Sequence, residues 1–180
     1  TAPPFSTKIA RLNAGDLVAD VEFVASDGTP RRLSDYRGQP LVLFFGTAEM
    51  IPADYLDGLV QKYGATGVQV LALVTRDTAE NYAAWRTLHE PRAPRFATAF
   101  DPVPVSQARD GVINRIFQFG APTPFSMVID ADGRFAGTFP WKLPQGQPGL
   151  AELLHRCGVP VDPADRLPAT QDGRGGEDRK

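Results

Sequence analysis

Cysteine, long apolar runs and an excess of either charge are all missing from this sequence. A single cysteine, Cys157, stands among 180 residues, which excludes an intrachain disulfide, a Cys-x-x-Cys pair and a zinc site of several thiolates. The formal net charge of −2 gives no electrostatic basis for binding nucleic acid. The longest apolar run, Leu41 to Phe45, is far shorter than the roughly 20 residues of a membrane-spanning helix. We therefore expect no nucleic-acid partner, no membrane span and no metal or other cofactor.

Glycine and proline are abundant by contrast, with 17 of each, and they gather near the two ends of the chain. The stretch 159–180 combines them with mixed charge and has no aromatic residue. Such a composition buries too little apolar surface to offset the entropy of ordering. We therefore expect an N-terminal extension at 1–16, one domain at 17–158 and a flexible polar tail at 159–180 that a protein partner could order.

The first residues hold no charged segment followed by an apolar one, and the chain starts at Thr1. A mature exported protein that has lost its signal peptide would start in this way. We therefore expect a periplasmic or otherwise exported protein. A shortened cytoplasmic chain would start in the same way, so that interpretation stays open.

The apolar pattern predicts alternating strands and helices. Two continuous apolar runs, 41–46 and 68–74, are typical of strands that are covered on both faces, and 95–100 could form a short strand. Turn residues at Asp27-Gly28 and at 130–133 predict two hairpins, over 20–33 and 125–139. Helical spacing and capping signals predict helices over 52–60, 77–89, 106–117 and 150–156. The sum is an α/β sandwich with a mixed sheet and an N-terminal β-hairpin.

Four segments, in this order, resemble the thioredoxin-like superfamily in its redoxin branch, which contains the AhpC/TSA peroxiredoxins and periplasmic thiol-disulfide oxidoreductases. They are SDYRGQPLVLFFG at 34–46, the helix that follows it, APTPF at 121–125 and DADGRF at 130–135. The resemblance covers residues 17–157. It implies a three-layer α/β/α sandwich, and it makes Pro124 the candidate for the cis-proline that lies beside the active site in this family.

The loop after the central strand decides what the resemblance implies for function. In redoxins a cysteine thiolate lies there, at the N-terminus of a helix that lowers its pKa. Aligned on the Cys-x-x-Cys pattern, the thiol positions are Glu49 and Pro52; aligned on the peroxiredoxin pattern, the position is near Ala53. A copper-delivery pattern falls on Met50 and Asp54. Because thiol exchange and peroxide reduction need a thiolate, we expect the family's chemistry to be lost.

Three functions stay open after this comparison. The first is a binding or structural subunit of a larger assembly. The second is a redoxin-class oxidoreductase or peroxidase that uses Cys157 or a partner's thiol, although a cysteine at the end of a helix is usually a small buried residue. The third is copper handling, because the segment FFGTAEM, which contains Thr47 and Met50, resembles copper-delivery factors.

A proline-flanked aromatic loop follows the last expected strand. Trp141 lies between Pro140 and Pro144, and tryptophan is enriched at the centres of protein interfaces. A tryptophan in this place could equally cover the edge of the core. These three residues are therefore candidates for binding a protein partner, with a structural role as the alternative.

Overall fold

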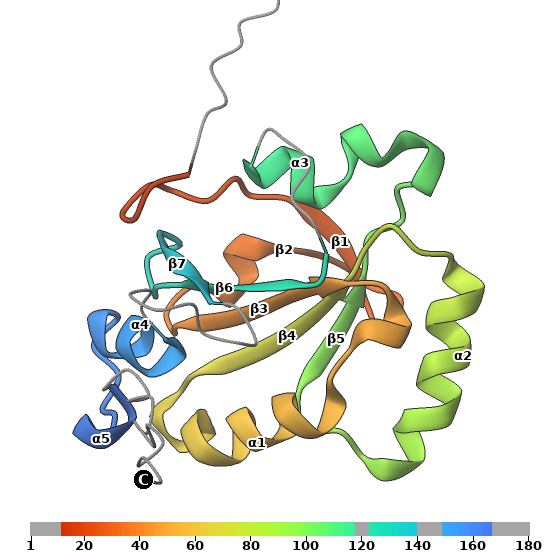
Figure 1. Cartoon of the computed structure of the whole chain (residues 1–180). Helices are drawn as coiled ribbons and strands as arrows, with labels where there is room; N and C mark the ends of the chain where they lie inside the picture. The colour runs from red at the N-terminus through yellow and green to blue at the C-terminus, as the bar shows by residue number, and fades with distance from the viewer. Residues whose placement is uncertain (1–11, 118–122, 140–148, 167–180) are drawn as a thin grey trace, which may run out of the picture.

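The computed structural model describes residues 12–117, 123–139 and 149–166, which form a mixed seven-stranded sheet with helices on both faces (Figure 1). The strand order is β2-β1-β5-β4-β3-β6-β7. The strands are β1 (Glu22–Ala25), β2 (Pro30–Arg32), β3 (Leu41–Gly46), β4 (Gln69–Val74), β5 (Ala97–Phe100), β6 (Phe125–Ile129) and β7 (Phe135–Phe139). The α/β class and the thioredoxin-like arrangement predicted from the sequence are confirmed.

Helices cover the sheet in two layers. Side chains of α1, α2 and α4 pack in one apolar cluster, and those of α3 pack in the cluster on the other face. The helices are α1 (Ala53–Tyr63), α2 (Ala79–His89), α3 (Val112–Phe117), α4 (Leu150–Arg156) and α5 (Pro163–Arg166). Within the described ranges, none of the helices is both long and apolar enough to cross a bilayer.

Strand β3 lies at the centre of both clusters. It pairs in parallel with β4 and antiparallel with β6, and all of its residues are buried. Val42 and Phe44 pack with α1 and α4, whereas Leu43 and Phe45 pack with α3. Because both faces of the strand are covered, both sets of alternating positions are apolar, which explains the continuous run in the sequence.

Both predicted hairpins form, and aspartate side chains stabilise their turns. Between β1 and β2, the Asp27 carboxylate accepts hydrogen bonds from the backbone and the hydroxyl of Thr29, and Gly28 has a left-handed φ of 84°. Between β6 and β7, Asp130 accepts from the backbone N–H groups of Asp132 and Arg134. These local bonds explain why the turns can be predicted from sequence.

Three helices have boundaries that differ from prediction. The helix predicted over 52–60 is α1, which runs from Ala53 to Tyr63. The segment predicted as one helix over 106–117 contains a 3₁₀ turn over 105–110, and α3 begins only at Val112. The buried Asp101 carboxylate accepts from the Val112 N–H at 3.0 Å and so fixes the start of α3. The helix predicted from residue 77 begins at Ala79, because Thr78 is the residue that caps it, accepting from the Asn81 N–H.

The packed chain extends beyond both boundaries expected at 17 and 158. Val159 is 4% exposed, and Val161 packs against the cluster that includes α1 and α4. At the other end, the backbone N–H of Gly15 donates to the Phe135 carbonyl at 2.8 Å. Residues 159–166 therefore pack on the folded unit, through the two valines and through the ion pairs Lys62–Asp165 and Glu152–Arg166.

Substituting Val159 tests whether this segment contributes to stability. Val159→Ser is expected to lower the free energy of unfolding by about 1.5–3 kcal/mol. The substitution removes the buried methyl groups of valine and places a hydroxyl in an apolar environment. Val105→Ser, at a valine that is 53% exposed, should change it by less than about 0.5 kcal/mol. Chemical denaturation measures both. Equal and small effects would mean that residues 159–166 do not belong to the cooperative unit.

Candidate functional site

The loop between β3 and α1 carries the positions at which redoxins hold their cysteines. It forms a short 3₁₀ turn, η2 (Ala48–Met50), and then enters α1. Glu49 is exposed and Met50 is 38% exposed, whereas Ile51 is buried. Pro52 is the N-cap of α1 and Ala53 is its first residue. The loop therefore presents carboxylate, thioether and apolar side chains at the positions that the resemblance assigns to thiols.

A buried carboxylate from the next strand connection holds this loop in position. Asp77 follows β4 and is 9% exposed. One of its oxygens accepts from the Ala48 N–H at 2.7 Å, and the other accepts from the Thr78 N–H and the Asn81 side chain, both at 2.8 Å. Asp77 therefore ties η2 to the N-terminus of α2.

Asp77 is not among the site residues predicted from the sequence. A signal was available, since an acid three residues after the end of a buried parallel strand lies near the edge of the sheet where the carboxyl ends of such strands meet.

A groove of about 560 Å³ lies between the loop and α2. One wall of the groove comes from η2 and its flanking residues, and the other comes from one face of α2. The residues that line it include Thr47, Glu49, Ile51, Asn81, Leu88 and His89. The volume is within the range of ligand sites in proteins. Thr47, a residue of the redox-loop pattern, has a buried hydroxyl oxygen with no hydrogen-bond partner in the described part of the chain.

The His89 ring has a defined orientation at one end of the groove. It stacks on Trp85, with ring centroids 4.2 Å apart and planes 9° apart. Its Nδ1 lies 2.9 Å from the Trp85 carbonyl oxygen. A carbonyl can only accept, so Nδ1 carries the hydrogen and, in the neutral ring, Nε2 is an acceptor.

The proline element lies next to the start of the loop. The Thr123–Pro124 peptide bond is cis. Phe125 pairs with Phe45 in the sheet, so Pro124 is beside Gly46, the last residue of β3. Loop and proline therefore come together at one end of the sheet.

Cys157 lies at the other end of the sheet. It is the C-cap of α4, is half-buried, and packs at the margin of the cluster that includes α1 and α4. Burial raises the pKa of its thiol to about 11, and the charge of Asp130 adds to the shift. Asp130 follows Ile129, which pairs with Leu41 at the start of β3. At about 3.3 Å per residue, β3 separates that end from Gly46 by roughly 16 Å.

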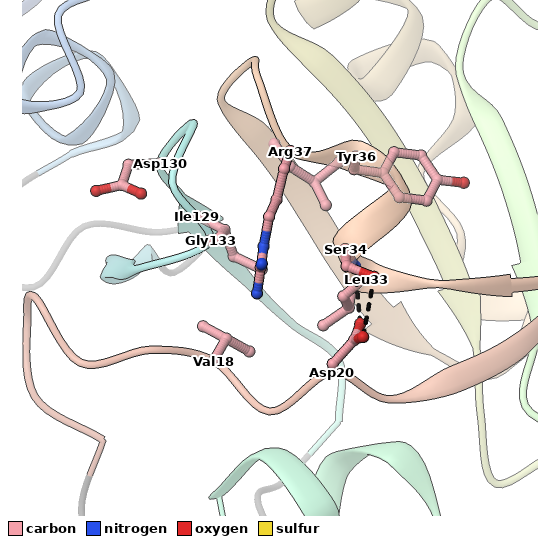
Figure 2. A pocket seen from close by; sticks show the side chains of 10 residues that line it. Val18, Asp20, Leu33, Ser34, Tyr36, Arg37, Ile129, Asp130 and Gly133 are labelled. Carbon is pink, nitrogen blue, oxygen red and sulfur yellow. Dashed lines mark hydrogen bonds between the residues drawn. The ribbon is translucent and has the colours of Figure 1, made fainter.

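A cavity near the start of β3 is too small for a ligand (Figure 2). Val18, Arg37 and Gly133 are among the residues that line it, and its volume is about 10 Å³, enough for one water molecule. Asp20 accepts hydrogen bonds from the backbone and hydroxyl of Ser34 there. The residues around this cavity pack the segment before β1 and the segment before β3 against the β6–β7 turn.

The remaining predicted site residues have different outcomes. Pro140, Trp141 and Pro144 lie outside the described residues, so their partner-binding role stays a prediction. Met50 and Asp54, the positions of the copper-delivery pattern, are both exposed. Within residues 12–117, 123–139 and 149–166, no three His, Cys, Asp or Glu side chains gather in a way that could hold a metal ion. Copper handling likewise stays a prediction.

Removing the Asp77 carboxylate tests its role in fixing the loop. Asp77→Ala should lower the free energy of unfolding by about 2–3 kcal/mol, because the buried Ala48 N–H loses its acceptor. Glu80→Ala removes a neighbouring exposed acid of α2 and should cost less than about 0.5 kcal/mol. Chemical denaturation followed by far-UV circular dichroism measures both. Equal losses would contradict a specific role for Asp77.

The chain is similar to a known protein family and to two named proteins. The AhpC/TSA family profile matches residues 14–144. Proteins from two strains of Mycobacterium tuberculosis, provisionally named as peroxiredoxins, are each 33% identical over 129 residues. The match covers 71% of this chain and 66% of theirs, so the chain spans slightly less than two thirds of the length of those relatives.

Solved structures show the same fold. A structure from Chlorobium tepidum, provisionally assigned as a thiol:disulfide interchange protein, has a TM-score of 0.60 at 22% identity and covers 81% of this chain and 98% of its own. A peroxidoxin from Mycobacterium tuberculosis has a TM-score of 0.56 at 22% identity, covering 82% and 94%. These structures show the fold, and the family profile over residues 14–144 shows that the chain belongs to the AhpC/TSA family.

Proposed function

We propose that this redoxin does not carry out thiol chemistry at the family's position and acts by binding a protein partner, as a subunit of a larger assembly. One observation carries the proposal. The single thiol, Cys157, lies at the end of the sheet opposite the loop. The positions that the family resemblance assigns to reactive cysteines, Glu49 and Pro52 in one alignment and Ala53 in another, hold no thiol.

The reactivity of Cys157 supports the same conclusion. Thiol exchange and peroxide reduction both start from a thiolate. A thiol pKa of about 11 instead of the ordinary 9.0 leaves about 100-fold less thiolate at pH 7. The position at a helix C-terminus also disfavours the thiolate of Cys157, because that end of α4 carries partial negative charge. Redoxin thiolates lie instead at a helix N-terminus, which carries partial positive charge.

A fixed loop and an open groove beside it support a binding role. The connection between β3 and α1 is held rigidly by Asp77, and a groove beside it remains open between η2 and α2. Rigid loops on a buried sheet are common positions for binding residues.

Activity assays test the proposal directly. Hydrogen peroxide consumption with dithiothreitol and insulin disulfide reduction are expected to equal the protein-free rate, both for the native chain and for Cys157→Ser. The chain should also elute above its own mass of 19.5 kDa from an extract of its source cells, as a subunit would. Cys157-dependent turnover at about 1 s⁻¹ or faster, within the ordinary range of enzymes, would support the alternative oxidoreductase and overturn the proposal, as would purification as a stable monomer.

The titration of Cys157 provides a separate test. The rate of alkylation by iodoacetamide should rise with a midpoint near pH 11 in the folded protein and near the ordinary value of 9.0 in guanidinium chloride. The sign follows from burial, which favours the neutral thiol and therefore delays its ionisation.

A matched variant moves the thiol to the family position. In Cys157→Ser/Ala53→Cys, the introduced thiol lies at the N-terminus of α1 and should titrate below about pH 8. A midpoint below 9 for native Cys157 would contradict the inert role assigned to it.

A further inference from the structure

Several polar groups along the groove between η2 and α2 are hydrogen-bond acceptors that receive no donor from the described part of the chain. In the described part of the chain, no group donates to the Glu49 carboxylate, to the side-chain oxygen of Asn81 or to Nε2 of His89; the amide nitrogen of Asn81 and Nδ1 of His89 are already engaged. The buried hydroxyl of Thr47, which can donate as well as accept, is also unpartnered. A ligand that donates hydrogen bonds would satisfy the acceptors of Glu49, Asn81 and His89.

The charge of the groove has one sign. Glu49 and Asp77 are the carboxylates that line it, and no lysine or arginine of the described residues does so. The α2 cation Arg86 pairs with Glu90 and lines a different pocket. The groove therefore attracts a cation rather than an anion.

Apolar side chains lie beside the acceptors. Ile51 is buried and forms part of the wall, and Leu88 is 65% exposed at the rim. Such a combination suits an arginine, whose methylene stem covers apolar surface while its guanidinium donates up to five hydrogen bonds in a planar fork.

The exposure of the groove favours a polypeptide over a small molecule. Pockets for small ligands cover most of the ligand's surface, whereas Glu49, Asn81 and Leu88 lie exposed along this groove. An exposed leucine next to free acceptors is suited to a segment that brings an arginine together with neighbouring apolar residues.

From these observations we infer that the groove between η2 and α2 binds an arginine side chain presented by an exposed segment of a partner protein, with Glu49 as the main anionic contact and Leu88 packing on the residues beside that arginine. The inference deepens the proposed binding function by naming the chemistry of the partner.

Fluorescence polarisation with two labelled pentapeptides tests it. One peptide has a central arginine between two leucines, and the other has citrulline, the neutral isostere, in its place. The arginine peptide should bind saturably to the full chain, and the citrulline peptide about tenfold more weakly, because a charge-assisted hydrogen bond is lost. Glu49→Gln should weaken arginine-peptide binding about tenfold and leave citrulline-peptide binding unchanged.

Matched variants separate the groove from general charge and apolarity. Glu80→Gln changes the net charge of the protein by the same amount as Glu49→Gln, but Glu80 does not line the groove. This variant should alter affinity by less than about twofold at physiological salt. Leu88→Ser should weaken both peptides, whereas Val105→Ser, at another exposed apolar residue, should weaken neither. Amide chemical shifts in an NMR titration should change most at Ala48 and Asn81.

Three results would overturn the inference: no saturable binding of the arginine peptide at millimolar concentration, equal affinity for the two peptides, or an affinity that Glu49→Gln leaves unchanged. None of them depends on Cys157 or on turnover. Failure here would therefore leave the absence of thiol chemistry standing, and Cys157-dependent turnover would overturn the proposed function without affecting the peptide affinities.

Discussion

Complete burial of β3 on both faces and both edges is the constraint on which the rest of the structure depends. Its neighbours β4 and β6 satisfy its backbone groups, and the helical layers cover its side chains. The chain leaves β3 at Gly46, where there is no room for a larger side chain. A Cβ on Gly46 would lie 2.9 Å from the Phe44 ring and 3.3 Å from Cβ of Met50. The start of the loop that follows is therefore fixed by close packing at Gly46 as well as by the hydrogen bond from Ala48 to Asp77.

The elements that could be predicted from sequence are those whose cause is local. The continuous apolar runs identify β3 and β4, and the Asp27-Gly28 and Asp130–Gly133 turns identify the hairpins, because the stabilising bonds lie within a few residues. Elements that depend on distant partners were missed. The start of α3 is fixed by Asp101, 11 residues before Val112, and Val159 is anchored by helices that a composition argument does not contain.

The candidate site divides in the same way. The loop positions from Thr47 to Ala53 and the element at Pro124 could be found from sequence, because the order of segments resembles a family whose geometry is fixed. The α2 side of the groove could not. Asp77 reaches Ala48 across 29 positions of the chain, and the partnerless acceptors of Asn81 and His89 become visible only when the other nitrogens of the same side chains are assigned partners. Sequence patterns show which side chains are present, but not which of their atoms remain unsatisfied.

The electrostatic character of the loop and its reactivity can be separated in this fold. A redoxin active site stabilises an anion, the thiolate, beside a helix N-terminus. Glu49, in one alignment the position of the first cysteine, lies in η2, the turn before α1, and has a carboxyl group that cannot form a sulfenate or a disulfide. An anion that cannot act in redox exchange can still form ion pairs and accept hydrogen bonds. The same scaffold that lowers the pKa of a thiol in its relatives therefore suits, in this chain, the binding of a cation, because a fixed loop and a fixed α2 hold the acceptors in place before the ligand arrives.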